Sequence, residues 1–313
     1  MLRKMKNMVR AYIGMLNMDR RAYRISREIE EGSEKIPARD TPVAIHVLLF
    51  AVTVVTTTLA GAQQRDTILA SVLSGIPFSA TIMSILLAHE MGHYFAARHF
   101  RVKATLPYFI PFPSIIGTMG AVIKIKSPIE DKRALLYIGA MGPLIGFSLS
   151  LGAAVVGMYL SEVKPLPSAA GTMEIPIFGD SLLFKALSLL VHGEIPPGHD
   201  VYLSPYAWAG WIGFLVTSLN LMPMGQLDGS HILYALIGRR QLLIGWACFL
   251  GLVALSFVWP GWIVWVLMAL FFLMIGHPPI PDASPLSAGE RLLGWCCIAI
   301  FIITFIPVPV NFL

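Results

Sequence analysis

Two histidines and a glutamate lie close together in an apolar stretch at residues 82–98, where His89, Glu90 and His93 form the pattern His-Glu-x-x-His. On a helix, residues four apart share one face, so both imidazoles can point at a single ion with the carboxylate beside it. Zinc hydrolases use this pattern: the imidazoles bind the metal, and the carboxylate handles a proton of a water molecule. The plainer alternative is a buried helix whose polar groups satisfy one another.

A catalytic zinc usually has three protein ligands, so this pattern needs a third one from elsewhere in the chain. The candidates are Asp228, His231 and His277. Asp228 is favoured because it follows a helix break at Pro223 and lies in a turn that can direct a short carboxylate back into the protein. The alternative for Asp228 is an N-cap of the helical segment that begins near residue 230.

Asn220 lies in an apolar segment eight residues before Asp228. A buried amide needs hydrogen-bond partners. Its N–H group can donate to the oxyanion that forms when water attacks a carbonyl. An ordinary hydrogen bond between helices is the alternative role.

The composition places these polar residues in a membrane protein. Of the 313 residues, 56% are hydrophobic and 13% are charged, with a mean hydropathy of +0.71; a soluble domain has about 25% charged residues. Because ionisable groups inside a bilayer are costly, such a cluster indicates function. We expect an all-α polytopic bundle with seven spans, or six as the alternative. The expected spans are residues 42–62, 77–97, 134–160, 205–222, 242–258, 261–276 and 290–310.

Residues 99–131 do not have the pattern of a helix, because prolines and glycines interrupt them. Ala121, Ile123 and Ile125 alternate with Lys124 and Lys126, which predicts a short membrane-associated β-hairpin. Non-helical backbone is tolerated at membrane depth only where protein buries it or water reaches it, so we expect the hairpin to flank the site. An ordinary surface hairpin is the alternative.

The positive charges predict the topology. Residues 1–41 hold ten of the 23 lysines and arginines, and residues 98–133 hold seven more. Lysine and arginine concentrate on cytoplasmic segments, so seven spans with a cytoplasmic N-terminus put the site near the cytoplasmic face. The charge excess therefore indicates membrane topology and not a nucleic-acid partner. We expect two domains: residues 1–41 as a cytoplasmic, basic amphipathic segment on the membrane surface, and residues 42–313 as the membrane domain.

The motif HEMGH at 89–93, together with NLMPMGQLDG at 220–229, resembles the paired motifs of the site-2 protease family of intramembrane zinc metalloproteases. The second motif follows the family pattern at Asn220, Pro223, Leu227, Asp228 and Gly229. The region around Gly142 and Pro143 is also similar to the glycine-rich segment of the family. Residues 77–313 carry the resemblance, which is strongest to the plastid and cyanobacterial-type branch without PDZ or CBS domains.

The resemblance implies an intramembrane zinc-dependent endopeptidase that cuts membrane-anchored proteins in or near their transmembrane segment, as in regulated intramembrane proteolysis. It implies one Zn²⁺ per chain on His89, His93 and Asp228, with Glu90 as the general base and Asn220 as the oxyanion donor. The expected partners are transmembrane substrates and the lipid bilayer. The expected location is a bacterial plasma membrane, with a plastid membrane as the alternative. The rival function is a membrane transporter or metal-binding membrane protein, although the sequence shows no internal repeat of the kind that transporters often have.

Overall fold

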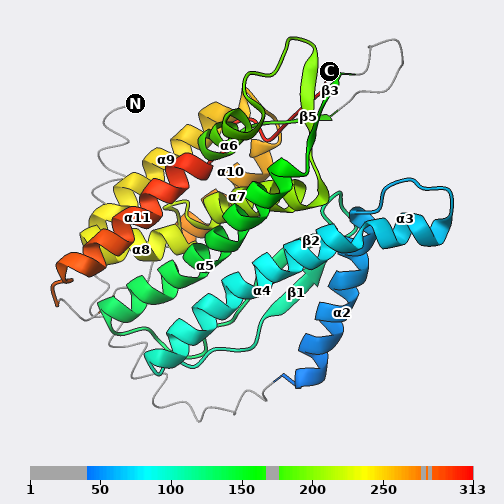
Figure 1. Ribbon diagram of the computed structural model, residues 1–313. Coiled ribbons are helices and arrows are strands. Elements are labelled where there is room, and N and C mark those ends of the chain that lie inside the picture. The colour runs from blue at the N-terminus through cyan, green and yellow to red at the C-terminus, as the bar shows by residue number, and fades with distance from the viewer. Residues whose placement is uncertain (1–40, 167–175, 276–279, 281–283, 313) are drawn as a thin grey trace. The chain divides into compact units, whose positions relative to one another are not determined.

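The computed structural model describes residues 41–166, 176–275, 280 and 284–312. The chain divides into two compact units, Met1–Pro42 and Val43–Leu313. The predicted surface helix within residues 1–41 lies outside the described residues, apart from Thr41. The second unit is mostly helical (Figure 1). Its helices are α2 (Val43–Ala60), α3 (Ile68–Ser74), α4 (Ile76–His99), α5 (Lys132–Tyr159), α6 (Leu182–His192), α7 (Pro205–Asn220), α8 (Asp228–Ile237), η1 (Gly238–Arg240), α9 (Gln241–Ser256), α10 (Trp262–Ile275) and α11 (Ala288–Thr304).

Each of the seven predicted spans coincides with a helix, but the helices differ in length. Within the described residues, four stretches are long and apolar enough to cross a membrane: Val43–Ala60, Ile68–His99, Lys132–Tyr159 and Asp228–Ser256. The last of these joins α8, η1 and α9. Helices α7, α10 and α11 have 16, 14 and 17 residues, fewer than the roughly 20 residues that usually span the hydrocarbon core. The protein is therefore an integral membrane protein with at least these four candidate spans.

Local sequence signals account for where the central helices begin. The side chain of Asp131 caps α5 by accepting a hydrogen bond from the backbone N–H of Arg133 at 2.7 Å. Ser204 caps α7 in the same way, and Pro205 follows at a position where a missing N–H costs nothing. Ser287 and Glu290 form a reciprocal capping box at the start of α11.

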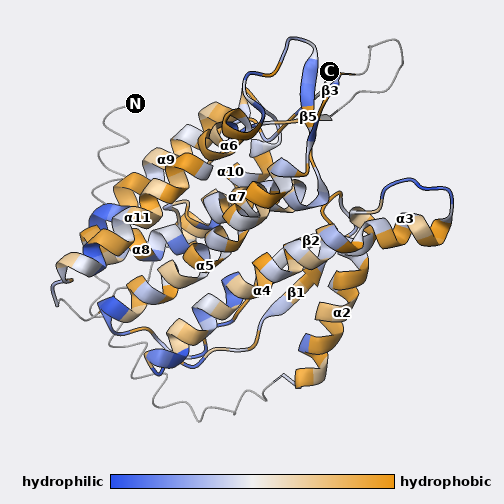
Figure 2. Ribbon diagram, in the orientation of Figure 1, coloured by the Kyte–Doolittle hydropathy of each residue, from blue (hydrophilic) through white to orange (hydrophobic). Residues whose placement is uncertain are grey.

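Helices α4, α5 and α7 pack against one another and form the centre of the bundle. Small residues bring the backbones of α5 and α7 close together, for example Gly210 against Ala154 and Gly157 against Ala207. The outer helices carry apolar residues on their exposed surface (Figure 2). On α2, Val47 and Leu48 are exposed. This pattern suits helices that contact lipid, which is as apolar as their side chains.

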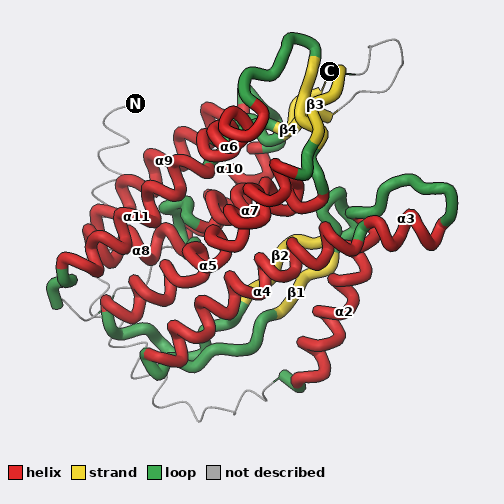
Figure 3. Tube along the Cα trace, in the orientation of Figure 1, coloured by secondary structure: helices red, strands yellow, loops and turns green. Residues whose placement is uncertain are grey.

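The predicted hairpin is confirmed. Strands β1 (Tyr108–Pro111) and β2 (Thr118–Val122) pair in antiparallel fashion and lie between α2 and α4 (Figure 3). The buried His46 of α2 anchors β1: its Nδ1 lies 3.0 Å from the carbonyl oxygen of Pro107, and its ring packs on Tyr108 at 4.2 Å. Gly117 turns the hairpin at φ +82° and touches the backbone of α2, where a side chain would overlap it.

Residues 161–204 contain more structure than the sequence predicts. Helix α6 lies within this segment. Two further two-stranded sheets escape prediction, because their strands are only three or four residues long: β3 (Glu162–Pro165) with β5 (His199–Tyr202), and β4 (Pro176–Phe178) with β6 (Val310–Phe312). The segment joins the end of α5 to the start of α7, so it lies at the end of these helices opposite Lys132 and Asn220.

Candidate metal centre

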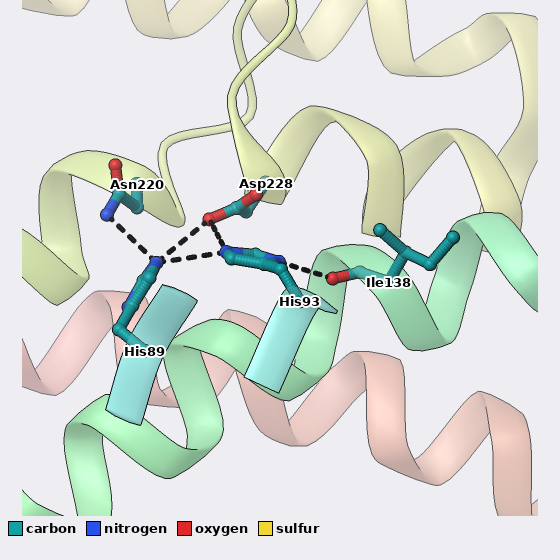
Figure 4. A network of polar contacts seen from close by, with 5 residues as sticks. All are labelled: His89, His93, Ile138, Asn220 and Asp228. Carbon is teal, nitrogen blue, oxygen red and sulfur yellow. Dashed lines mark hydrogen bonds and ion pairs between the residues drawn. The ribbon is translucent and has the colours of Figure 1, made fainter. Parts of the chain in front are cut away.

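Helix α4 places both histidines of the motif on its inner face. His89 and His93 are buried, with 4% and 6% of their surface exposed. Their Nε2 atoms lie 3.0 Å apart, and Figure 4 shows the rings converging on one point. The i, i+4 prediction for these residues agrees with this geometry.

Asp228 completes a triangle of ligand atoms. As the first residue of α8, it places Oδ2 3.2 Å from His93 Nε2 and 3.5 Å from His89 Nε2. In a tetrahedral zinc site with bonds of about 2.0–2.1 Å, ligand atoms lie about 3.3 Å apart, so the three distances fit one ion. Two facing imidazole nitrogens beside a carboxylate also form the donor set that zinc prefers. The N-cap of α8 is Leu227, so the capping alternative for Asp228 is wrong.

A backbone carbonyl of α5 orients His93. The Nδ1 of His93 lies 2.6 Å from the carbonyl oxygen of Ile138 (Figure 4). A carbonyl can only accept, so Nδ1 carries the proton and donates it. Nε2 is therefore left with the lone pair that faces His89 and Asp228, which is the usual outer support of a metal-binding histidine.

Glycines on α5 make room for these imidazoles. A Cβ atom at Gly142 would overlap His93 Nε2, and one at Gly146 would lie 3.0 Å from His89 Nδ1. Gly139 sits against the backbone of Asp228. The glycine-rich part of α5 thus serves the site as well as helix packing, a point that the sequence leaves open.

We expect Gly142→Ala to weaken zinc binding by about 10–100-fold, because the added methyl group pushes His93 out of position. Gly152→Ala is a matched control on the same helix, since a Cβ there meets nothing within 4 Å. The control should retain zinc and gain stability of about 1 kcal/mol or less from the better helix propensity of alanine. Zinc content of the purified proteins measures both effects, and equal zinc in the two variants would contradict this account.

Glu90 lies beside the ligand triangle but is not part of it. It is 6% exposed, and its carboxylate is hydrogen-bonded by the backbone of Ile123, the residue after β2. The hairpin therefore flanks the site, as expected. This contact leaves Glu90 next to the ligands with a carboxylate that can accept a proton.

Asn220 also reaches the cluster, from the last residue of α7. Its Nδ2 lies 3.3 Å from His89 Nε2, so the amide of one helix meets the imidazole of another (Figure 4). His231 lies one turn after Asp228 and packs against Gly139, outside the triangle of ligand atoms. The third ligand candidate, His277, lies outside the described residues.

The fold and the site together define an integral membrane protein in which two buried histidines and a partly buried aspartate lie close enough to hold a metal ion. The chain belongs to peptidase family M50, whose profile matches residues 77–245 and thereby confirms the predicted family.

Curated relatives agree with this membership. The chain is 28% identical over 242 residues to the probable zinc metalloprotease EGY2, chloroplastic, of Arabidopsis thaliana, covering 76% of this chain and 43% of the relative. It is 30% identical to the probable zinc metalloprotease EGY1, chloroplastic, of Arabidopsis thaliana, covering 75% of this chain and 43% of the relative. It is 32% identical to the EGY1 protein of Oryza sativa subsp. japonica, covering 75% of this chain and 41% of the relative. The chain thus spans less than half the length of these relatives. No solved structure matches it.

Proposed function

We propose that this protein is an intramembrane zinc-dependent endopeptidase that hydrolyses a peptide bond in or near the transmembrane segment of membrane-anchored proteins. The observation that carries the proposal is the meeting of His89, His93 and Asp228 among apolar helices, with Glu90 beside them. Membership of a peptidase family and relatives named as probable zinc metalloproteases support it.

In this proposal His89, His93 and Asp228 hold one Zn²⁺, and Glu90 is the general base. Bound zinc supplies Lewis acidity that polarises the scissile carbonyl. Glu90 accepts a proton from the attacking water and then delivers it to the leaving amine nitrogen. The hydrogen bond from the backbone of Ile123 holds the carboxylate in place for both transfers. The burial of His89, Glu90 and His93 limits the access of other water molecules.

Asn220 is the proposed oxyanion donor. The amide of Asn220 faces the lone pair of His89 Nε2, and the same lone pair would bind the metal. With that lone pair on the metal, the amide N–H would be free to donate to the reacting oxygen. We expect Asn220→Ala to lower kcat by about 10²–10³-fold while KM and zinc content stay near wild type, because the donor acts in the transition state. Steady-state kinetics with zinc analysis test this. Loss of zinc in the variant would instead assign Asn220 a structural role.

We further propose that α7, α10 and α11 also cross the membrane, giving seven spans, and that the site lies near the cytoplasmic face. Arg98 near the end of α4, Arg133 near the start of α5 and Arg239 in η1 support this orientation. The alternating topology puts all three on one side, and lysine and arginine concentrate on the cytoplasmic side. The location is a bacterial plasma membrane, or a plastid membrane as for the relatives named chloroplastic. Labelling single cysteines at 103 and 164 with an impermeant maleimide tests the orientation; labelling of both from one side overturns it.

Metal removal tests the proposed activity. Purified protein in liposomes should cleave a single-span substrate, lose all cleavage when 1,10-phenanthroline removes the zinc, and regain it when Zn²⁺ is restored, because the Lewis acid is essential. Mass spectrometry of the products gives the cut position. Cation flux across the liposomes without cleavage would favour the rival function as a transporter.

A further inference from the structure

A cavity lies away from the metal centre, near the start of α4. It has a volume of about 440 Å³. Five aromatic side chains line it: Phe78 of α4, Phe178 of β4, Phe184 of α6, Tyr202 of β5 and Trp208 of α7. The rings of Phe178 and Trp208 lie 4.2 Å apart. The cavity therefore offers aromatic walls built from five elements of the chain.

Two carboxylates lie on the lining of this aromatic pocket, Asp180 and Asp200. Burial raises the pKa of Asp180, and the negative charge of Asp200 raises it further, although Lys185 opposes this. Asp200 accepts a hydrogen bond from the backbone N–H of Val201 at 2.8 Å. Lys164, the cation next to Tyr202, forms an ion pair with Glu162 at 2.7 Å. Lys185 offsets one of these charges, and within the described residues the two aspartates and Lys185 together leave a net negative charge at the pocket.

The pocket lies at a defined distance from the metal centre. Phe78 and His89 both lie on α4, eleven residues apart. At 1.5 Å per residue, the pocket lies about 16 Å along the helix from the ligands. An extended chain of about five residues spans that distance.

We propose that this pocket binds a lysine side chain that flanks the substrate's transmembrane segment, and that this contact sets the position of the cut. The proposal rests on the proposed function. The aliphatic stem of lysine suits the aromatic walls, and its ammonium group suits the aspartates and the ring faces. A substrate held there reaches the metal centre with an extended segment of about five residues.

Cleavage assays with the full-length protein in liposomes test the proposal. Two single-span substrates differ only in a lysine or a methionine at the flank nearest the pocket. We expect wild type to prefer the lysine substrate by about tenfold in kcat/KM, as a contact worth about 1.4 kcal/mol would give. The Asp180→Asn, Asp200→Asn double variant should cleave the two substrates equally, whereas Glu194→Gln, an exposed acid near the pocket, should keep the preference. An unchanged preference in the double variant, or none in wild type, overturns the proposal.

A charge-swap variant keeps the proposal testable if the double variant does not fold. Asp180→Lys should prefer a substrate with glutamate at the same flank over the lysine substrate, and its zinc content shows that it folds. Moving the lysine of the substrate by two residues should move the cut by two residues in wild type. A cut that stays in place would overturn the measuring role of the pocket.

Photo-cross-linking separates this proposal from the proposed activity. The probe is the lysine substrate with p-benzoylphenylalanine next to the lysine, added to the full-length Glu90→Gln variant. We expect cross-links to the pocket residues that fall at least tenfold with the methionine probe. If cross-links depend on the lysine but wild type does not cleave the substrate, the proposed activity is wrong and the proposed lysine site is supported. If wild type cleaves the substrate but the cross-links do not depend on the lysine, the lysine site is wrong and the proposed activity is supported.

Discussion

Replacing Glu90 with glutamine is expected to abolish proteolysis while zinc stays bound. The amide has nearly the same shape as the carboxylate but cannot accept a proton from water at neutral pH. General acid–base groups contribute about 10²–10⁴-fold to the rate, so cleavage of a single-span substrate should fall by at least about 10²-fold. Zinc content should match wild type, because Glu90 is outside the triangle of His89, His93 and Asp228. Product formation and metal analysis on the same preparations measure the two quantities.

Glu194→Gln is the matched control for this substitution, since Glu194 is an exposed acid outside the metal centre. It should cleave an ordinary substrate like wild type. Substantial cleavage by the Glu90→Gln variant would show that another group moves the proton. Loss of zinc from that variant would place Glu90 among the groups that hold the site together.

Replacing Asp228 with alanine is expected to remove zinc and proteolysis together. The substitution leaves two imidazole nitrogens 3.0 Å apart without their carboxylate. Disturbing only the outer support of a metal site costs about 10–100-fold in affinity, so losing a ligand should cost at least about 100-fold. Titration of the metal-free protein with Zn²⁺ measures the affinity. Stability should change less than metal binding, because Asp228 begins α8 without capping it.

Asp66→Asn provides the control for the loss of an aspartate, as Asp66 is exposed in the link between α2 and α3. It should bind zinc and cleave substrate as wild type does. If the Asp228→Ala variant kept wild-type zinc affinity, the third ligand would have to be another residue. His231, which lies one turn further along α8, would then be the first to test.

The helices could be predicted from the sequence because their signals are local. Apolar runs, capping residues and proline or glycine breaks act within a few residues of where they occur, and α2, α4, α5 and α9 lie within a few residues of their predicted ranges. The hairpin was predictable for the same reason, from its two-residue alternation and its glycines. The two other small sheets were not, since strands of three or four residues carry too few side chains to show a period.

The number of membrane spans could not be read from the sequence with the same accuracy. Hydropathy and the charge distribution indicate seven crossings, whereas helix lengths identify four clear candidates. A short helix such as α7 is buried among α4 and α5 on much of its surface, so protein contacts replace part of the lipid contact that a long span needs.

By itself the sequence predicted the metal-binding chemistry of the site: the i, i+4 histidines and the adjacent glutamate lie together because of the pitch of a single helix. The sequence also favoured Asp228 as the third ligand, and the tertiary structure places Asp228, not His231, beside the two histidines. Only the tertiary structure showed that Gly142 leaves space for His93. It alone also revealed the aromatic pocket at the far end of α4. The reason is physical: the metal centre arises where α4, α5, α7 and α8 approach one another, and the pocket arises where α4, α6 and α7 meet β4 and β5. The distance between helices depends on packing over the whole bundle and not on the pattern within any one segment.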